Sequence, residues 1–171
     1  MTNLRNIRLI AAVLMLTACF PLAAQNILTV RSVQQFEQAM TALQSSIETH
    51  GYTVAHVQTC DSGLKGFGYE TDRYRVVFLG KFAETRQLSE KYPDLIPFLP
   101  LKIAVFAEGD QTIASVINPS SLGAFYADED LRIQFKRWEN DLRSILADLQ
   151  KNGHSYSGTT HLSAIGTSPL E

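Results

Sequence analysis

The chain has little of what many functional sites are built from. Its 171 residues include two cysteines and one tryptophan, with no Cys-x-x-Cys or Cys-x-x-Cys-His motif. It also has no Gly-x-Ser-x-Gly elbow and no phosphate-binding glycine motif. These absences argue against a cysteine-based metal or haem site, a triad hydrolase and a phosphate-binding loop.

Basic residues are too few and too scattered for a nucleic-acid-binding surface. Arg5 and Arg8 belong to an N-terminal leader, and removing them from the 15 basic residues leaves 13 against 17 acidic residues, a net charge of −4. Because nucleic-acid binding depends on clustered cations, we expect no nucleic-acid partner.

The leader is apolar but too short to span a bilayer. Residues 9–16 form an uninterrupted apolar run behind Arg5 and Arg8, as in the hydrophobic part of a signal peptide. The run ends in Leu16-Thr17-Ala18-Cys19, which resembles a bacterial lipobox. That resemblance implies cleavage before Cys19 and a diacylglyceryl group on its sulfur, and more than one acyl chain gives stable anchoring.

We therefore expect residues 1–18 to be a signal peptide, residues 19–25 to be a linker, and the protein to be periplasmic and lipid-anchored to a membrane. The alternative is an ordinary secretory signal cut after Ala24. Both alternatives place the domain outside the cytoplasm and leave Cys60 without an internal disulfide partner.

Residues 26–152 predict one domain organised around a β-hairpin. Residues 102–107 and 112–117 are rich in β-branched and aromatic side chains, and the turn residues Gly109 and Asp110 lie between them. Neither face of this hairpin is strongly polar, so we expect it in the middle of a sheet.

Two amphipathic helices flank the strands. The first is predicted from Val33 to His50, with a capping box at Ser32 and Gln35 and a C-cap at Gly51. The second is predicted from Asp128 until Gly153 stops it. Its apolar positions are Leu131, Phe135, Trp138, Leu142, Ile145 and Leu149.

Further strands are predicted at residues 27–31, 52–57 and 74–80, with a short helix between residues 81 and 93. The order β-α-β-β-α-β-β-α predicts a two-layer α+β fold, with a mostly antiparallel sheet and two long helices packed on one face. The other face keeps apolar side chains, so we expect a homodimer or a covered sheet. Residues 153–171 are predicted to be a disordered tail.

Four different short motifs follow one another along the domain. They are Phe78-Leu79-Gly80-Lys81, Tyr92-Pro93, Phe98-Leu99-Pro100-Leu101-Lys102 and Ile117-Asn118-Pro119. Over about residues 26–151 the chain resembles the domain of unknown function 302 (DUF302) family. The resemblance implies a two-layer α+β fold, often a dimer, and no established activity. Many members carry an acidic residue and a histidine after the second strand, where this chain has Thr59-Cys60-Asp61.

Cys60 is the sharpest candidate for chemistry. It lies at a predicted strand end beside Asp61, in a stretch with three glycines and Lys65. A thiolate is the reactive form, which Lys65 would favour and Asp61 would disfavour. Cys60 is therefore either an exposed thiol that carries or attacks a sulfur or electrophilic ligand, or a buried and inert cysteine. The candidate ligand-binding residues are His56, Cys60, Asp61 and Lys65.

A metal or haem site is not expected. On one regular strand His56 and Cys60 share a face but lie roughly 13 Å apart at about 3.3 Å per residue, too far to ligate one ion. Asp128, Glu129 and Asp130 suit a helix N-terminus without a cation. The sequence thus predicts no cofactor and an exported binding domain, not an enzyme, that takes a small ligand or a protein partner. The alternative is a thiol-dependent sulfur-transfer or redox protein that uses Cys60.

Overall fold

The computed structural model describes residues 26–60, 66–68 and 73–157, and for residues 152–157 only the helical backbone. Five strands form one sheet: β1 (Ile27–Ser32), β2 (Thr53–Thr59), β3 (Tyr74–Gly80), β4 (Leu101–Glu108) and β5 (Gln111–Ile117). The α-helices are α2 (Phe36–Thr49), α4 (Phe82–Lys91) and α5 (Glu129–Ser157). Two short 3-10 helices, η1 (Pro93–Phe98) and η2 (Pro119–Ala124), follow α4 and β5.

The sheet is antiparallel throughout, in the order β1-β5-β4-β3-β2. The predicted hairpin is confirmed: β4 and β5 pair from Ala104↔Ser115 to Glu108↔Gln111, around a turn in which Gly109 has φ +61°. A positive φ strains any residue with a Cβ, so glycine suits this turn. β4 is the central strand, as expected for the least polar segment.

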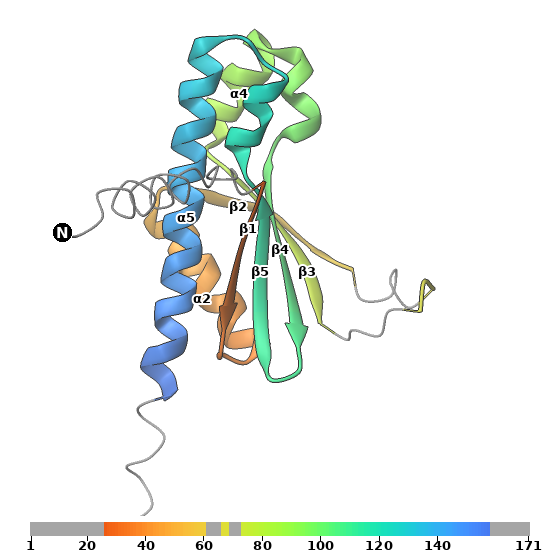
Figure 1. The fold of residues 1–171 in the computed structure, drawn as a ribbon, viewed down its shortest axis with the longest axis vertical. Helices are drawn as coiled ribbons and strands as arrows, with labels where there is room; N and C mark the ends of the chain where they lie inside the picture. The colour runs from red at the N-terminus through yellow and green to blue at the C-terminus, as the bar shows by residue number, and fades with distance from the viewer. Residues whose placement is uncertain (1–25, 61–65, 69–72, 158–171) are drawn as a thin grey trace, which may run out of the picture.

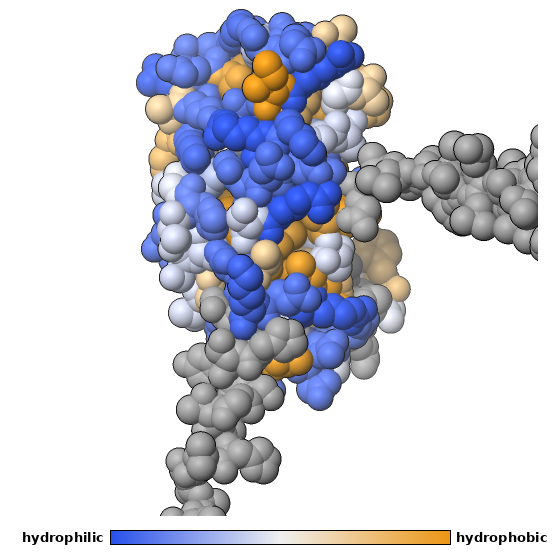
Figure 2. All heavy atoms as spheres, turned by 60° about the vertical axis from the view of Figure 1, so that its left-hand side comes forward, coloured by the Kyte–Doolittle hydropathy of each residue, from blue (hydrophilic) through white to orange (hydrophobic). Residues whose placement is uncertain are grey.

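Helices α2 and α5 lie side by side on one face of the sheet (Figure 1), which confirms the predicted two-layer α+β fold. Between the layers lies a closed apolar core, to which α5 contributes Leu131, Phe135, Trp138, Leu142, Ile145 and Leu149. These are the predicted positions, at 0–2% exposure. Figure 2 brings the α5 side forward and shows mostly hydrophilic residues on it, as expected for the outer face of amphipathic helices.

The predicted start of the first long helix is wrong. Ser32 still belongs to β1, where it pairs with Thr112, and α2 begins only at Phe36. The Ser32 hydroxyl accepts a hydrogen bond from the Gln34 N–H at 3.3 Å, closing a local turn in place of a capping box. Val33, expected in the apolar stripe, is 47% exposed. Strand pairing thus overrides the local capping signal.

The predicted end of the last helix is also wrong, since α5 continues past Gly153 to Ser157. A single glycine costs a helix only about 1 kcal/mol relative to alanine, which is not enough to end it. The predicted tail beyond residue 157 lies outside the described residues. Among the described residues, no helix combines the length and the apolar character needed to cross a bilayer.

The second face of the sheet is called the open face here. It carries the side chains that alternate with the core positions: His56 and Gln58 from β2, Tyr74, Val76 and Phe78 from β3, Lys102, Ala104 and Phe106 from β4, Ile113, Ser115 and Ile117 from β5, and Ile27, Thr29 and Arg31 from β1. Most are half-buried or exposed. The ion pair of Arg31 with Glu108 crosses β5 beside Ile113, which is 2% exposed.

Candidate functional site

The structure places two of the sequence candidates on the open face. His56 pairs with Phe78 across a bulge in β2, and their rings lie 5.9 Å apart. Cys60 directly follows β2, and its N–H still donates to the Tyr74 carbonyl at 3.0 Å, so it continues the register. The two side chains therefore lie on the same face of the edge strand β2 and its continuation, four residues apart along the chain.

Cys60 is half-buried, and its Sγ lies 3.8 Å from the carbonyl oxygen of Gln58. Asp61 and Lys65, the residues expected to tune the thiol, lie outside the described residues. Within the part of the chain that the structure describes, no group of three metal-ligating side chains comes together. Among the described residues, Cys60 therefore lies at the surface, and no other reactive side chain is assembled around it.

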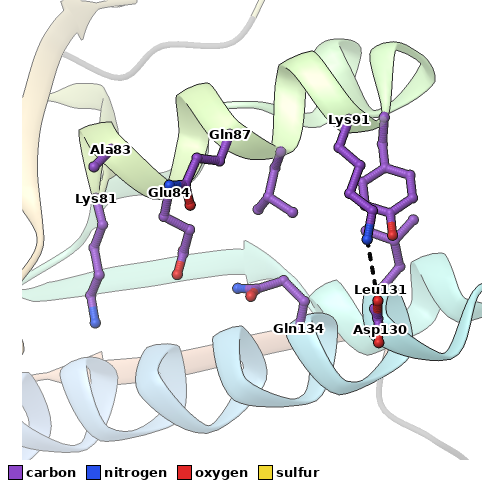
Figure 3. Close-up of a pocket in the computed structure, with 10 residues that line it drawn as sticks. Lys81, Ala83, Glu84, Gln87, Lys91, Asp130, Leu131 and Gln134 are labelled. Carbon is purple, nitrogen blue, oxygen red and sulfur yellow. Dashed lines mark hydrogen bonds and ion pairs between the residues drawn. The ribbon is translucent and has the colours of Figure 1, made fainter.

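A concave feature formed by described residues lies elsewhere, between α4 and the first half of α5 (Figure 3), with a volume of about 530 Å³. We call it the α4–α5 groove. The α4 side contributes Lys81, Ala83, Glu84, Gln87, Leu88, Lys91 and Tyr92, and the α5 side contributes Asp130, Leu131 and Gln134. Volumes of this size are typical of small-molecule sites in proteins.

One end of the groove is closed by polar contacts between the helices. Lys91 Nζ lies 3.2 Å from Asp130 Oδ2, and the Tyr92 hydroxyl donates to Asp128 Oδ2 at 3.1 Å. The other oxygen of Asp128 accepts the N–H of Leu131 at 3.1 Å, which caps α5. That backbone hydrogen bond is the main reason why the pKa of Asp128 lies below its usual value. The acids at residues 128–130 thus serve the helix start, as the sequence suggested.

At mid-groove, Glu84 connects α4 to α5. Its carboxylate accepts the indole N–H of Trp138 at 2.9 Å and pairs with Arg137. Trp138 is the single tryptophan of the chain and is 2% exposed. A buried indole N–H needs an acceptor, so Glu84 both anchors α4 and satisfies the core tryptophan.

Beyond Glu84 lies a buried phenol. The Tyr52 hydroxyl donates to Asp141 Oδ2 at 2.7 Å, and Arg137 lies 3.6 Å from the same oxygen. Burial, and then this hydrogen bond to a carboxylate, raises the pKa of Tyr52 far above its ordinary value. Lys81 lies over the Tyr52 ring, with its Nζ 4.5 Å from the ring centroid and 3.9 Å from Asp141.

Among the described residues that line the groove there is no serine, threonine, cysteine or histidine, and the raised pKa keeps the neighbouring Tyr52 hydroxyl protonated as the donor to Asp141. Sequence reasoning missed Lys81, Glu84 and Gln134, because each is a polar residue outside the apolar stripe of its segment and nothing local shows that α4 lies against α5. A usable signal existed in Lys81, the last residue of a motif that the sequence analysis had already marked.

A second group resembles a serine–histidine–aspartate set in composition only. The Ser46 hydroxyl and His50 Nε2 each lie 3.0 Å from the same oxygen, Asp148 Oδ2. In a catalytic triad the histidine bridges serine and aspartate, whereas here both partners converge on the aspartate. The group therefore joins α2 to α5, and its hydrogen bond from His50 is the main cause that lowers the pKa of Asp148.

A buried carboxylate joins η2 to α5. Glu139 is 5% exposed and accepts hydrogen bonds from Asn118 at 3.2 Å and Ser120 at 2.6 Å, while Lys136 and Arg143 pair with it at 2.8 and 2.7 Å. Burial alone would raise the pKa of Glu139, but these hydrogen bonds and charges outweigh it and lower the pKa to about 2. The Asn118-Pro119 motif is thus structural: Asn118 caps η2 and binds Glu139.

The fold and its sites define a two-layer α+β domain with a polar groove between two helices and a second sheet face on which no described helix packs. The chain belongs to the DUF302 family, "Domain of unknown function DUF302", whose model matches residues 28–149. A crystal structure of an uncharacterized conserved DUF302 protein from Bacillus stearothermophilus superposes with a TM-score of 0.65 at 19% identity, covering 74% of this chain and 99% of that one. At this identity the likeness shows the fold alone. A comparison with curated proteins gave no match.

Proposed function

We propose that this chain is an exported, lipid-anchored binding domain, without catalytic activity of its own, that pairs with a second copy through the open face. The observation that carries the proposal is the composition of that face. Its centre holds Val76, Phe78, Ala104 and Phe106, and Ile117 at its end is 68% exposed. An uncovered sheet face of this kind usually marks an interaction surface.

A second copy is the partner that best fits the charge of the face. Arg31 and Glu108 neutralise each other across β5, and Lys102 donates to the Pro97 carbonyl at 3.4 Å. A face with so little net charge does not repel its own copy, and most homo-oligomers use such a self-complementary patch about a two-fold axis.

The test of pairing is the mass of the folded protein in solution, measured by sedimentation on the chain from residue 20 onwards, which lacks both the apolar leader and the lipidated cysteine and so needs no detergent. We expect a dimer for this chain and a monomer after Ala104→Glu, which puts a charge at the centre of the open face. Ile117→Glu should weaken pairing. Ile133→Glu is the matched control, because Ile133 is 63% exposed on α5, away from the face. A chain that stays monomeric at high micromolar concentration would refute the pairing.

The anchoring rests on the lipobox that ends at Cys19. Mass spectrometry of the N-terminus tests it directly: a lipidated chain begins at Cys19 and carries acyl chains, and Cys19→Ser loses both the lipid and membrane retention. A mature chain that begins at Gln25 would leave the domain exported but free of the membrane.

A further inference from the structure

The α4–α5 groove contains hydrogen-bond donors that lack acceptors. The Nε2 atom of Gln134 is buried and has no hydrogen-bond partner. In Figure 3 the Gln134 side chain extends from α5 into the space beneath Glu84. A buried amide N–H2 without an acceptor is costly, and such a group in a native fold calls for an explanation.

Lys81 supplies a second incompletely satisfied donor at the same groove. Among the described residues its nearest carboxylate oxygen is Asp141 Oδ2 at 3.9 Å, which is beyond hydrogen-bond distance. Its ammonium is held in place by the Tyr52 ring, and the side chain is 34% exposed. The Lys81 ammonium is therefore held in a defined position, is accessible, and can donate further hydrogen bonds.

The carboxylates of the groove, by contrast, are already paired with cations. Glu84 uses one oxygen for the Trp138 indole and the other for Arg137. Asp130 is paired with Lys91. The buried Nε2 of Gln134 and the Lys81 ammonium are therefore the donors that a ligand would satisfy, and their complement is an acceptor, best a negatively charged one.

The local charge balance allows an added anion. Lys81 and Arg137 offset Glu84 and Asp141, so the polar cluster is neutral before a ligand arrives. The apolar part of the lining includes Leu88 and Leu131, one from each helix, and the Lys91–Asp130 pair closes one end. A ligand with a short apolar body and one charged end fits this distribution.

We propose that the α4–α5 groove binds a small carboxylate with a short aliphatic body, whose carboxylate accepts a hydrogen bond from Gln134 and is attracted by the Lys81 ammonium, while its aliphatic part contacts Leu88 and Leu131. This site is separate from the open face, and the proposal does not depend on pairing or anchoring.

The experiment is a titration of the folded chain from residue 20 onwards, without the leader and the lipidated cysteine, followed by Trp138 fluorescence and by backbone amide shifts. Trp138 reports on the groove because its indole N–H donates a hydrogen bond to Glu84, which lines the groove. Hexanoate is the probe, and hexanamide and hexylamine keep the same chain with a neutral or cationic end. We expect saturable binding of hexanoate, with shifts concentrated at Glu84, Leu131 and Gln134, and at least tenfold weaker binding of the other two.

Variants locate the site. Lys81→Met and Gln134→Leu should each weaken hexanoate binding by about tenfold or more, the loss expected for a hydrogen bond to a charged group. Gln134→Leu removes an unsatisfied buried amide, so it should fold at least as well as the parent chain. Lys151→Met is the control, because Lys151 lies near the far end of α5 and its side chain is 77% exposed.

Four results would overturn the proposal: no saturable binding of hexanoate, equal binding of hexanamide, unchanged affinity in both groove variants, or binding of inorganic phosphate in preference to hexanoate. Each is readable without knowledge of the oligomeric state. Failure of this proposal is therefore distinguishable from failure of the proposed function, which is measured by mass in solution and at the N-terminus.

Discussion

The hydroxyl of Tyr52 donates to Oδ2 of Asp141 at 2.7 Å, so the residue just beyond α2 is tied to the middle of α5. Gly51, with φ +74°, turns the chain so that Tyr52 enters the core, where it is 3% exposed. One hydrogen bond thus links the two helices at the base of the polar cluster beside the α4–α5 groove.

Tyr52→Phe should lower the free energy of unfolding by about 2 kcal/mol, because it removes a buried hydrogen bond to a charged acceptor. Tyr126→Phe is the control: its hydroxyl donates to the backbone carbonyl of Asp94, and we expect a smaller loss. Urea unfolding at neutral pH measures both. Equal losses would mean that the burial of Tyr52 adds nothing to its hydrogen bond.

Tyr52 should also resist ionisation in base. Its folded pKa is raised above the ordinary value of 10, so the unfolded state loses this proton first, and stability declines as pH rises above that value. The difference between the phenolate absorbance titrations of the parent chain and Tyr52→Phe should contain no component near pH 10 while the fold persists. A component near pH 10 in the folded protein would contradict this expectation.

Glu139→Gln should change the acid limb of stability. The folded pKa of Glu139 is about 2 against an ordinary 4.5, so its contribution is present above pH 4.5 and is lost as pH falls towards 2. A shift of this size corresponds to about 3 kcal/mol. The variant should therefore be less stable at neutral pH and lose less between pH 4.5 and 2.

Thermal unfolding across that pH range is the measurement for Glu139→Gln. Glu37→Gln is the control, since Glu37 is an exposed carboxylate in the first turn of α2. Parallel acid limbs for Glu139→Gln and the parent chain would show that the network around Glu139 is not coupled to folding.

Gly51→Ala should cost about 1 kcal/mol of stability. A Cβ at this position would meet nothing closer than Lys81 Cε at 3.9 Å, so the cost comes from the positive φ alone. Gly123→Ala tests this, because its Cβ also has ordinary contact, with Arg132 Cγ at 3.9 Å, and its φ is not positive. Denaturant midpoints should fall for Gly51→Ala and stay nearly unchanged for Gly123→Ala.

Cys60 should react with a thiol reagent in the folded protein, because it is half-buried at a strand end. Lipidated chain should take up one label, since Cys19 is then blocked. We expect Cys60→Ser to leave hexanoate binding unchanged, because Cys60 does not line the α4–α5 groove. Reaction only after unfolding would show that Cys60 is inert, and altered binding would connect it to the groove.

The periodic parts of this fold were predictable from sequence. The apolar spacing from Leu131 to Leu149 required one long helix with one buried face, and strand alternation around Gly109 required a hairpin. Both features follow from a local spacing of apolar residues, and the same residues form the core. The start of α2 failed because Ser32 satisfies strand pairing with Thr112, a contact 80 residues away that no local signal reveals.

The groove was less predictable, because it is made by tertiary contacts between polar residues. Glu84 and Gln134 look like ordinary surface residues of two amphipathic helices until α4 lies against α5. His56 and Cys60 were predicted to share a face, and the register puts them on the open face, but a shared face did not by itself create a concave site.

The position of β1 fixes the end of the sheet at which the chain enters the domain. Ile27 opens β1 beside Ile117, and the Asn118 N–H donates to the Asn26 carbonyl at 2.8 Å, so the chain enters at the end of the sheet that also carries η1, η2 and α4 (Figure 1). A lipid on Cys19 would leave at most about 30 Å of extended chain before Ile27. The tether would then hold this end of the sheet, and not the β4–β5 turn at the opposite end, closest to the headgroups.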